Sequence, residues 1–249
     1  MRILLLNPNT STAVTDRMHA VAQDIASPTT EIVPLTAPRG VPYIATRAEA
    51  LIGGAIALEM LAEHLPDADA VILAAFGDPG LGAMRELASV PVIGLAEAAM
   101  LTSCMLGRRF SIVSFARALG PWYEECVDYH GLRERLAAIR LADAPFTSIT
   151  EVQNEMLDLI VDMANQTAVD DEADVVILAG APLAGLAERI ADQVSVPVVD
   201  GVAAATRHAE TLAMLKPRKA TTGTFRRPDP KPSKGLPSAV ARLLAGEDT

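Results

Sequence analysis

Short apolar runs rich in Val, Ile and Leu alternate along the chain with longer segments in which apolar residues recur at helical spacing. The runs predict strands at residues 3–6, 31–34, 70–74, 92–95, 109–114, 175–179 and 198–199. The segments between them predict helices at residues 11–26, 46–64, 80–88, 97–106, 119–137, 149–166, 183–193 and 201–214, with a last short helix at 238–244. Strands without polar alternation are typical of sheets buried on both faces. We therefore expect an α/β protein with parallel sheets.

The chain also contains an internal repeat. Residues 68–99 and 172–205 share the same order of an acidic turn, an apolar strand, a Gly/Pro-rich loop, a helix and a Ser-Val-Pro-Val segment, at an offset of 105 to 106 residues. Such a long period predicts two similar lobes related by a pseudo-twofold axis, although two βαβ units can look alike by composition alone. We assign the first lobe to residues 1–95 plus 202–215, the second to 96–201, and a C-terminal tail to 216–249.

The repeat indicates where a ligand would bind. In parallel sheets, ligands bind beyond the carboxyl ends of the strands. If the two lobes face each other, Ala75 and Gly180 occupy equivalent places on opposite walls of one cleft. We expect the active site in that cleft.

Composition and charge exclude several classes of protein. Half of the 249 residues are hydrophobic but only 4% are aromatic, and no apolar run approaches the roughly 20 residues that span a bilayer. The net charge of -10 argues against nucleic acid as a partner. We expect a soluble cytoplasmic protein that binds a small molecule and no membrane.

The charge is unevenly distributed. Residues 216–249 contain eight Lys and Arg against three Asp and Glu, and they include all four lysines of the chain. The lysine-free body cannot form a Schiff base with a carbonyl substrate. We expect the basic, Pro-rich tail to wrap across the acidic surface of its own chain or of a neighbouring subunit.

Two loops carry polar residues at strand ends. Asn-Pro-Asn-Thr-Ser at residues 7–11 closes the first strand and opens a helix, where free N–H groups can hold a carboxylate or an imide. Phe-Gly-Asp-Pro-Gly-Leu at residues 76–81 follows the third strand. Asp78 in this loop is either a base that acts on a ligand or the N-cap of the following helix.

These segments, together with residues 91–99, 108–113 and 196–202, resemble the aspartate/glutamate/hydantoin racemase superfamily, and specifically its hydantoin racemase branch. The resemblance covers residues 1–215. It implies two Rossmann-like lobes with the active site between them, no cofactor and a homo-oligomeric assembly. It also implies one catalytic cysteine in each lobe, one on each side of the substrate's stereocentre.

This chain lacks both of those cysteines. The first would stand where Ala75 is, and the second in the loop where this chain has Gly180-Ala181-Pro182. Cys104 and Cys126 instead fall inside predicted helices, where a cysteine is usually a small buried hydrophobe. The spacing of Cys and His residues shows no zinc motif, so we predict no metal site.

Three hypotheses follow from the missing thiols. In the first, the chain is an enzyme that keeps the substrate-binding loops but uses hydrolysis or elimination, with an acidic residue as base. In the second, it is an isomerase that uses carboxylates in place of thiols. In the third, it is a ligand-binding descendant without activity. Retention of the two loops favours the first hypothesis. Asp78 is the first candidate base and Glu97 the second, although an acid at the start of a helix also stabilises the helix dipole.

The remaining candidates are residues expected to bind the substrate. Tyr43 and Arg47 precede or open a helix and would close over the cleft, with Arg47 pairing a substrate carboxylate. The full set of predicted substrate-binding residues is Asn7, Asn9, Thr10, Tyr43, Arg47, Ala75, Phe76, Ser114, Arg117, Gly180, Ala181 and Pro182. Asp200 lies at the cleft or caps a helix, and His130 is expected to complement the dipole at a helix C-terminus.

Overall fold

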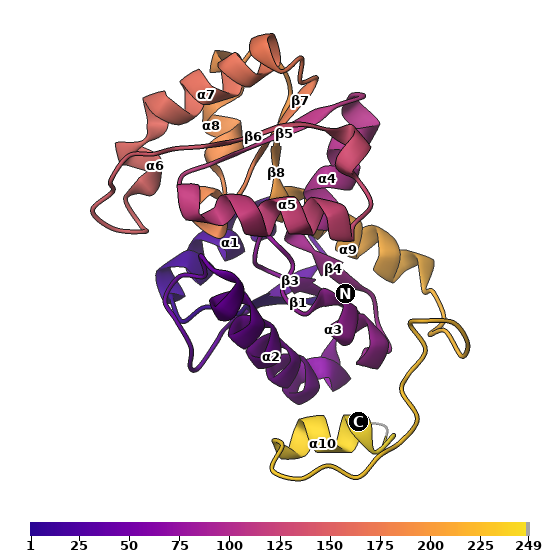
Figure 1. Ribbon diagram of the computed structural model, residues 1–249. Coiled ribbons are helices and arrows are strands. Elements are labelled where there is room, and N and C mark those ends of the chain that lie inside the picture. Colours follow the sequence, from indigo (N-terminus) through magenta and orange to yellow (C-terminus); the bar gives the residue numbers. More distant parts are fainter. Residues whose placement is uncertain (248–249) are drawn as a thin grey trace.

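Each half of the chain folds around a four-stranded parallel sheet, as the computed structural model of residues 1–247 shows (Figure 1). The first sheet has the order β2-β1-β3-β4 and consists of β1 (Arg2–Asn7), β2 (Glu31–Thr36), β3 (Ala70–Leu73) and β4 (Val92–Gly94). The second has the order β6-β5-β7-β8 and consists of β5 (Phe110–Ser114), β6 (Leu136–Leu141), β7 (Val175–Leu178) and β8 (Val198–Asp200). The predicted α/β class with parallel sheets is confirmed.

Helices connect the strands and cover both sheets. They are α1 (Thr12–Ile25), α2 (Arg47–His64), α3 (Leu81–Leu87), α4 (Leu95–Leu106), α5 (Gly120–Tyr129), α6 (Val152–Glu155), α7 (Leu157–Asp170), α8 (Leu186–Ile190), α9 (Gly201–Leu215) and α10 (Ser238–Leu244). Side-chain caps fix the starts of α1 and α2. Ser11 caps α1, and Thr46 and Glu49 form a capping box at the start of α2.

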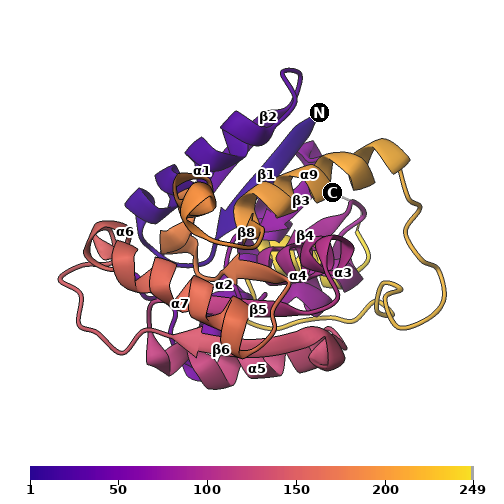
Figure 2. The same cartoon turned by 90° about the horizontal axis from the view of Figure 1, so that it is seen from above.

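The two lobes exchange a helix. α4 follows β4 of the first sheet but packs against β7 and β8 of the second. α9 follows β8 of the second sheet and packs against β3 and β4 of the first, and α4 and α9 contact each other (Figures 1 and 2). Each sheet is therefore buried partly by a helix that starts at the end of the other sheet, and the cores of the two lobes are continuous.

One predicted element is wrong. The periodicity predicts a helix over residues 119–137, but α5 ends at Tyr129, Gly131 adopts a φ of +68°, and residues 136–141 form β6. β6 is an edge strand whose residues are all half-buried. Its Leu-Ala-Ala-Ile-Arg-Leu sequence favours a helix intrinsically, so pairing with β5 overrides the local preference.

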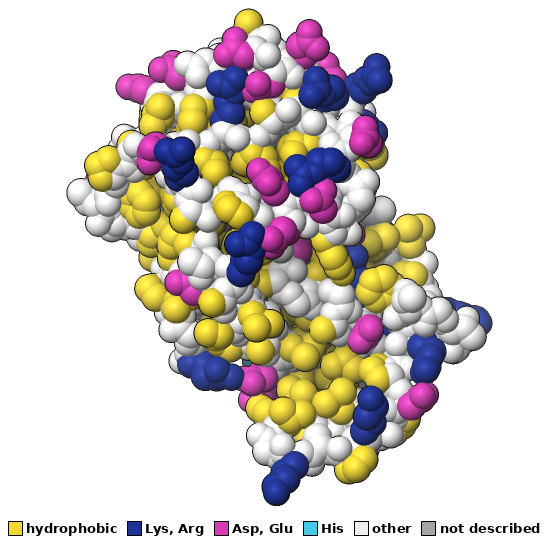
Figure 3. All heavy atoms as spheres, in the orientation of Figure 1, with side chains coloured by type: hydrophobic (Ala, Val, Ile, Leu, Met, Phe, Trp, Pro, Cys, Tyr) yellow, Lys and Arg dark blue, Asp and Glu magenta, His cyan; other side chains and the backbone are white. Residues whose placement is uncertain are grey.

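The C-terminal tail lies on the first lobe. It runs from α9 along the outside of the lobe, and α10 packs against α2 (Figure 1). Val240 and Leu243 of α10 are buried in the same cluster as Leu61 of α2. The Lys219 ammonium also donates to the Arg85 carbonyl. The contact of α10 is apolar rather than ionic, and Lys and Arg side chains are spread over both lobes in the view of Figure 3.

Among the helices of residues 1–247, none is both long and apolar enough to cross a membrane.

Candidate active site

A small cavity lies between the two lobes at the carboxyl ends of the central strands. Its volume is about 30 Å³, which is enough for a water molecule. The residues that line it are Asn9, Tyr43, Ile44, Ala75, Phe76, Trp122, Tyr123, Gly180, Ala181 and Pro182. Ala75 and Gly180 therefore share one cavity, as the internal repeat predicts.

The Asn-Pro-Asn-Thr-Ser turn reaches the cavity through Asn9. Asn7 is fully buried, and its side-chain amide donates to the Asn9 Oδ1 atom at 3.0 Å and to the Thr15 hydroxyl at 2.9 Å. The Asn9 Oδ1 atom also accepts from the Ser11 backbone N–H. Asn7 thus orients Asn9 without lining the cavity. Thr10 does not line it either; its backbone N–H donates to the carbonyl of Val41 at 2.9 Å.

Tyr43 carries the one buried hydroxyl group in the described part of the chain that has no hydrogen-bond partner. Its ring packs against Phe115, with 5.6 Å between the ring centroids. Burial and the charge of Glu49 raise the pKa of Tyr43 far above its usual value. The hydroxyl therefore stays protonated and is available to donate a hydrogen bond to a ligand in the cavity.

Gly180 forms the opposite wall in a backbone conformation that excludes side chains. Its φ is +110°, and a Cβ atom built on it would lie 2.8 Å from the Phe115 ring. Phe115 is fully buried and packs edge-on against Phe146. The aromatic side chains of Phe115 and Tyr123 therefore occupy the space beside the position where the family resemblance places a cysteine.

Ser114 and Phe76, which are also predicted substrate-binding residues, contact the residues around this wall. Ser114 is fully buried, does not line the cavity, and donates to the carbonyl of Ala179 at 2.7 Å. Tyr123 is hydrogen-bonded to Ser114, and burial raises its pKa well above the usual value. The Phe76 ring lies edge-on to Tyr123 at 5.0 Å. The cavity consequently presents a neutral, largely aromatic surface.

Both predicted bases lie outside the cavity. The Asp78 carboxylate accepts from the backbone N–H groups of Ala96 at 3.0 Å and Glu97 at 2.9 Å, so it caps α4 from a neighbouring loop. The same carboxylate lies 3.0 Å from the His130 Nε2 atom. Asp78 itself has a φ of +50°, which Asp tolerates better than most residues. This geometry favours a structural role for Asp78.

Glu97 is fixed by ion pairing. Both of its carboxylate oxygens bond the guanidinium of Arg85, and its Oε1 atom lies 3.5 Å from the His130 Nδ1 atom. Despite its burial, the hydrogen bonds from His130 and Arg85 lower the pKa of Glu97 to about 2. A carboxylate with that pKa is a weak proton acceptor near neutrality.

His130 stands at the C-terminus of a helix, as the sequence predicts, but its contacts with Asp78 and Glu97 are not predicted. It is the C-cap of α5, but its ring turns inward between Asp78 and Glu97, with a side chain that is 5% exposed. Burial opposes its charged form, but the two carboxylates raise its pKa to about 9. His130 lies 52 positions after Asp78 and 33 positions after Glu97 in the sequence. Neither a motif nor a periodic pattern therefore indicates these contacts.

The two predicted arginine ligands point away from the cavity. Arg47 of the first lobe pairs with Glu125 of α5, with the Nε atom 2.8 Å from the Oε1 atom. Arg117 pairs with Asp143 at 2.8 Å. Both pairs are exposed, and neither arginine lines the cavity. Arg47 thus links the lobes at their surface.

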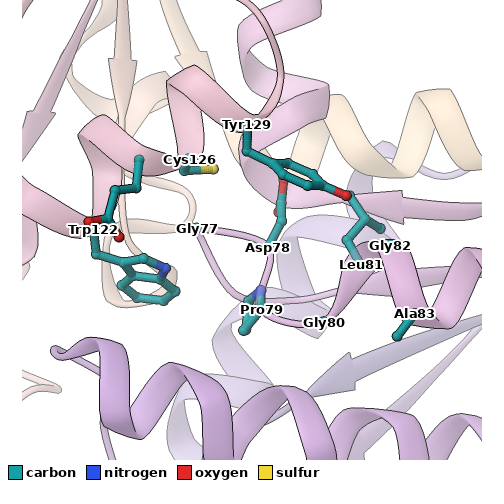
Figure 4. Close-up of a pocket in the computed structure, with 11 residues that line it drawn as sticks. Gly77, Asp78, Pro79, Gly80, Leu81, Gly82, Ala83, Trp122, Cys126 and Tyr129 are labelled. Carbon is teal, nitrogen blue, oxygen red and sulfur yellow. The ribbon is translucent and has the colours of Figure 1, made fainter.

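A larger pocket lies next to the cavity, behind Trp122. Its volume is about 500 Å³, and it lies between α5 and residues 77–83, which are the loop after β3 and the start of α3 (Figure 4). Trp122, Cys126 and Tyr129 project from α5 over the loop that carries Asp78. Trp122 lines both spaces, since its ring lies over Gly77. Neither Cys126 nor Cys104 lines the small cavity.

These features define a two-lobed α/β protein with a cavity between the lobes, at the carboxyl ends of the strands. The family model described as Asp/Glu/Hydantoin racemase matches residues 3–209, and the chain belongs to this family. It is 34% identical to the hydantoin racemase of Paenarthrobacter aurescens over 93% of this chain and 99% of that protein. Its structure superposes on allantoin racemase from Klebsiella pneumoniae with a TM-score of 0.90 and 32% identity, covering 96% of this chain and 98% of the other. For allantoin racemase from Pseudomonas fluorescens, the TM-score is 0.88 at 33% identity, covering 94% and 100% of the two chains.

Proposed function

We propose that this protein is an isomerase acting on a small cyclic ureide of the hydantoin or allantoin type, bound between Ala75 and Gly180. The observation that carries the proposal is the cavity at the strand ends, with the unpartnered Tyr43 hydroxyl and Asn9 on its lining. The relatives are racemases of hydantoin and allantoin, which favours isomerisation over the hydrolysis or elimination that the sequence analysis ranks first.

Isomerisation requires that the proton on the ring stereocentre leave and return on the other face. The C–H electron pair stays on the ring as an enolate, whose charge lies on the neighbouring carbonyl oxygen. A protonated Tyr43 hydroxyl donates a hydrogen bond to that oxygen and stabilises the charge as it develops. Among the described lining residues there is no thiol, carboxylate or imidazole, so a hydroxide ion from solvent accepts the proton and becomes water. A water molecule then protonates the opposite face of the enolate, which regenerates hydroxide.

The ligand must displace side chains on entry. A volume of about 30 Å³ admits a water molecule but not a five-membered ring. Tyr43 belongs to the loop between β2 and α2, which has no regular structure and carries one edge of the cavity. Movement of this loop opens the site with the least disturbance of the two sheets.

A second candidate function is ligand binding without turnover. The absence of a strong base from the described lining of the cavity favours it. The two functions share the same ligand and differ only in whether the ring proton exchanges with solvent.

The test uses single enantiomers of 5-substituted hydantoins and of allantoin in deuterated water. Isomerisation is expected to replace the ring proton by deuterium, seen by NMR, as optical rotation falls. Tyr43→Phe is expected to lower the rate about 10²–10³-fold, while Tyr129→Phe, which removes an exposed hydroxyl outside the cavity, leaves it unchanged.

Other outcomes decide against the proposal. Ring-opened product in the mass spectrum would establish hydrolysis instead. Thermal stabilisation by the ureide without exchange or ring opening would establish binding alone. No stabilisation and no turnover would exclude cyclic ureides as ligands.

A further inference from the structure

We propose that Asp78, Cys126 and His130 form a binding site for a divalent cation of the zinc class. One ligand atom from each side chain lies within 4.8 Å of the other two. Asp78 comes from the loop after β3 in the first lobe, whereas Cys126 and His130 come from α5 in the second. The site lies outside the cavity between Ala75 and Gly180 and does not depend on the function proposed for that cavity.

The three donors are those that zinc prefers. Zinc binds thiolate sulfur, imidazole nitrogen and carboxylate oxygen at about 2.0–2.3 Å, usually four ligands in a tetrahedron. Cys126 and His130 are four residues apart at the end of α5, a spacing that places two side chains on one helix face. The sequence analysis finds no zinc motif because Asp78 lies 48 residues before Cys126.

The surroundings hold the donors in orientation. The His130 Nδ1 atom faces Glu97 at 3.5 Å, and Arg85 holds Glu97 in turn, which leaves the Nε2 atom directed at Asp78. A carboxylate behind a ligating histidine is the usual outer partner at zinc sites. The backbone N–H groups of Ala96 and Glu97 fix both oxygens of Asp78.

The site is buried but open on one side. The side chains of His130 and Asp78 are 5% and 1% exposed, and Cys126 is buried as well. Asp78 and Cys126 line the pocket of about 500 Å³ beneath α5, which supplies an entry path and a place for water as the fourth ligand (Figure 4). On binding, the Cys126 thiol and the His130 Nε2–H each release a proton to solvent, and the cation replaces the hydrogen bond between His130 and Asp78. The cation would then join the two lobes.

The test is a titration of the full chain, stripped of metals with a chelator, with Co²⁺ as a spectroscopic probe. We expect a sulfur-to-cobalt charge-transfer band in the near ultraviolet that Zn²⁺ abolishes by competition. Cys104→Ser is the matched control and keeps the band, whereas Cys126→Ser loses it. Glu97→Gln, which removes the carboxylate beside the His130 Nδ1 atom together with its ion pair to Arg85, is expected to weaken binding about 10–100-fold.

Three results would overturn the site. They are the absence of the band from the unaltered protein, its persistence in Cys126→Ser, and its loss in Cys104→Ser. Circular dichroism shows whether Cys126→Ser is folded. If it is not, Asp78→Asn takes its place, because it retains both Cys126 and His130 and is expected to weaken Co²⁺ binding while the band remains; unchanged affinity in Asp78→Asn would overturn the assignment.

Discussion

The starts of α4 and α9 are equivalent in the two lobes but are built from different side chains. In the second lobe, Asp200 ends β8 and caps α9 through the N–H groups of Val202 and Ala203. Its other oxygen accepts from the Gly185 N–H at 2.6 Å, and burial raises its pKa. In the first lobe the equivalent position is Gly94, and a Cβ atom there would overlap the Asp78 carboxyl group at 2.4 Å.

The carboxylate that caps the exchanged helix therefore comes from the strand end in one lobe and from the loop in the other. In the first lobe this loop carboxylate also meets His130 and Glu97, and a charged cluster forms between the lobes. Asp200, by contrast, accepts hydrogen bonds from the backbone N–H groups of Gly185, Val202 and Ala203. Repetition of the backbone thus does not predict the role of an acidic side chain, even at equivalent junctions.

The largest expected effect is that of removing the cap in the first lobe. Asp78→Ala leaves the N–H groups of α4 and the buried His130 without their partner, and we expect the free energy of unfolding to fall by about 3–5 kcal/mol. Asp200→Ala is the matched variant, and the loss of an N-cap is expected to cost about 0.5–2 kcal/mol. Urea unfolding measures both values. Equal losses in the two variants would show that the cluster around His130 adds no stability beyond the cap.

The cavity walls provide the next comparison, since Ala75 and Gly180 are the equivalent residues that face each other. Gly180→Ala introduces a Cβ atom at a φ of +110° and against Phe115, and we expect a loss of about 2–4 kcal/mol. Gly131→Ala has a φ of +68° with no atom within 4 Å of the added Cβ, and only the backbone cost of about 1–2 kcal/mol is expected. Ala75→Cys needs no change of backbone.

If Gly180→Ala is no less stable than Gly131→Ala, then Phe115 moves freely and the second wall can accept a side chain. In that case the double substitution of Ala75 and Gly180 by cysteine would be a practical route to thiol chemistry in this cleft.

The comparison of the lobes also explains what the sequence can and cannot predict. Seven of the eight strands are predicted as apolar runs, among them the central strands β1, β3, β5 and β7, which are almost completely buried. The repeat locates the cavity between Ala75 and Gly180. The strand β6 is not predicted, because it is a half-buried edge strand composed of residues that favour helices. The contacts of Asp78 cannot be predicted from the sequence, because the packing of α5 and α4 brings its partners together and that packing leaves no periodic pattern in the sequence.

The smallest effect is expected at the surface between the lobes. Arg47→Ala removes the ion pair with Glu125, whose side chains are 60% and 55% exposed. Exposed ion pairs contribute little because water and salt screen the charges and two long side chains must be ordered. We therefore expect the urea midpoint of Arg47→Ala to match that of the unaltered chain, at low and at high salt. The contrary result is a loss in the free energy of unfolding that approaches the loss in Asp78→Ala and that becomes smaller at high salt. It would show that the exposed ion pair, rather than the buried contacts of Asp78, Glu97 and His130, holds the two lobes together.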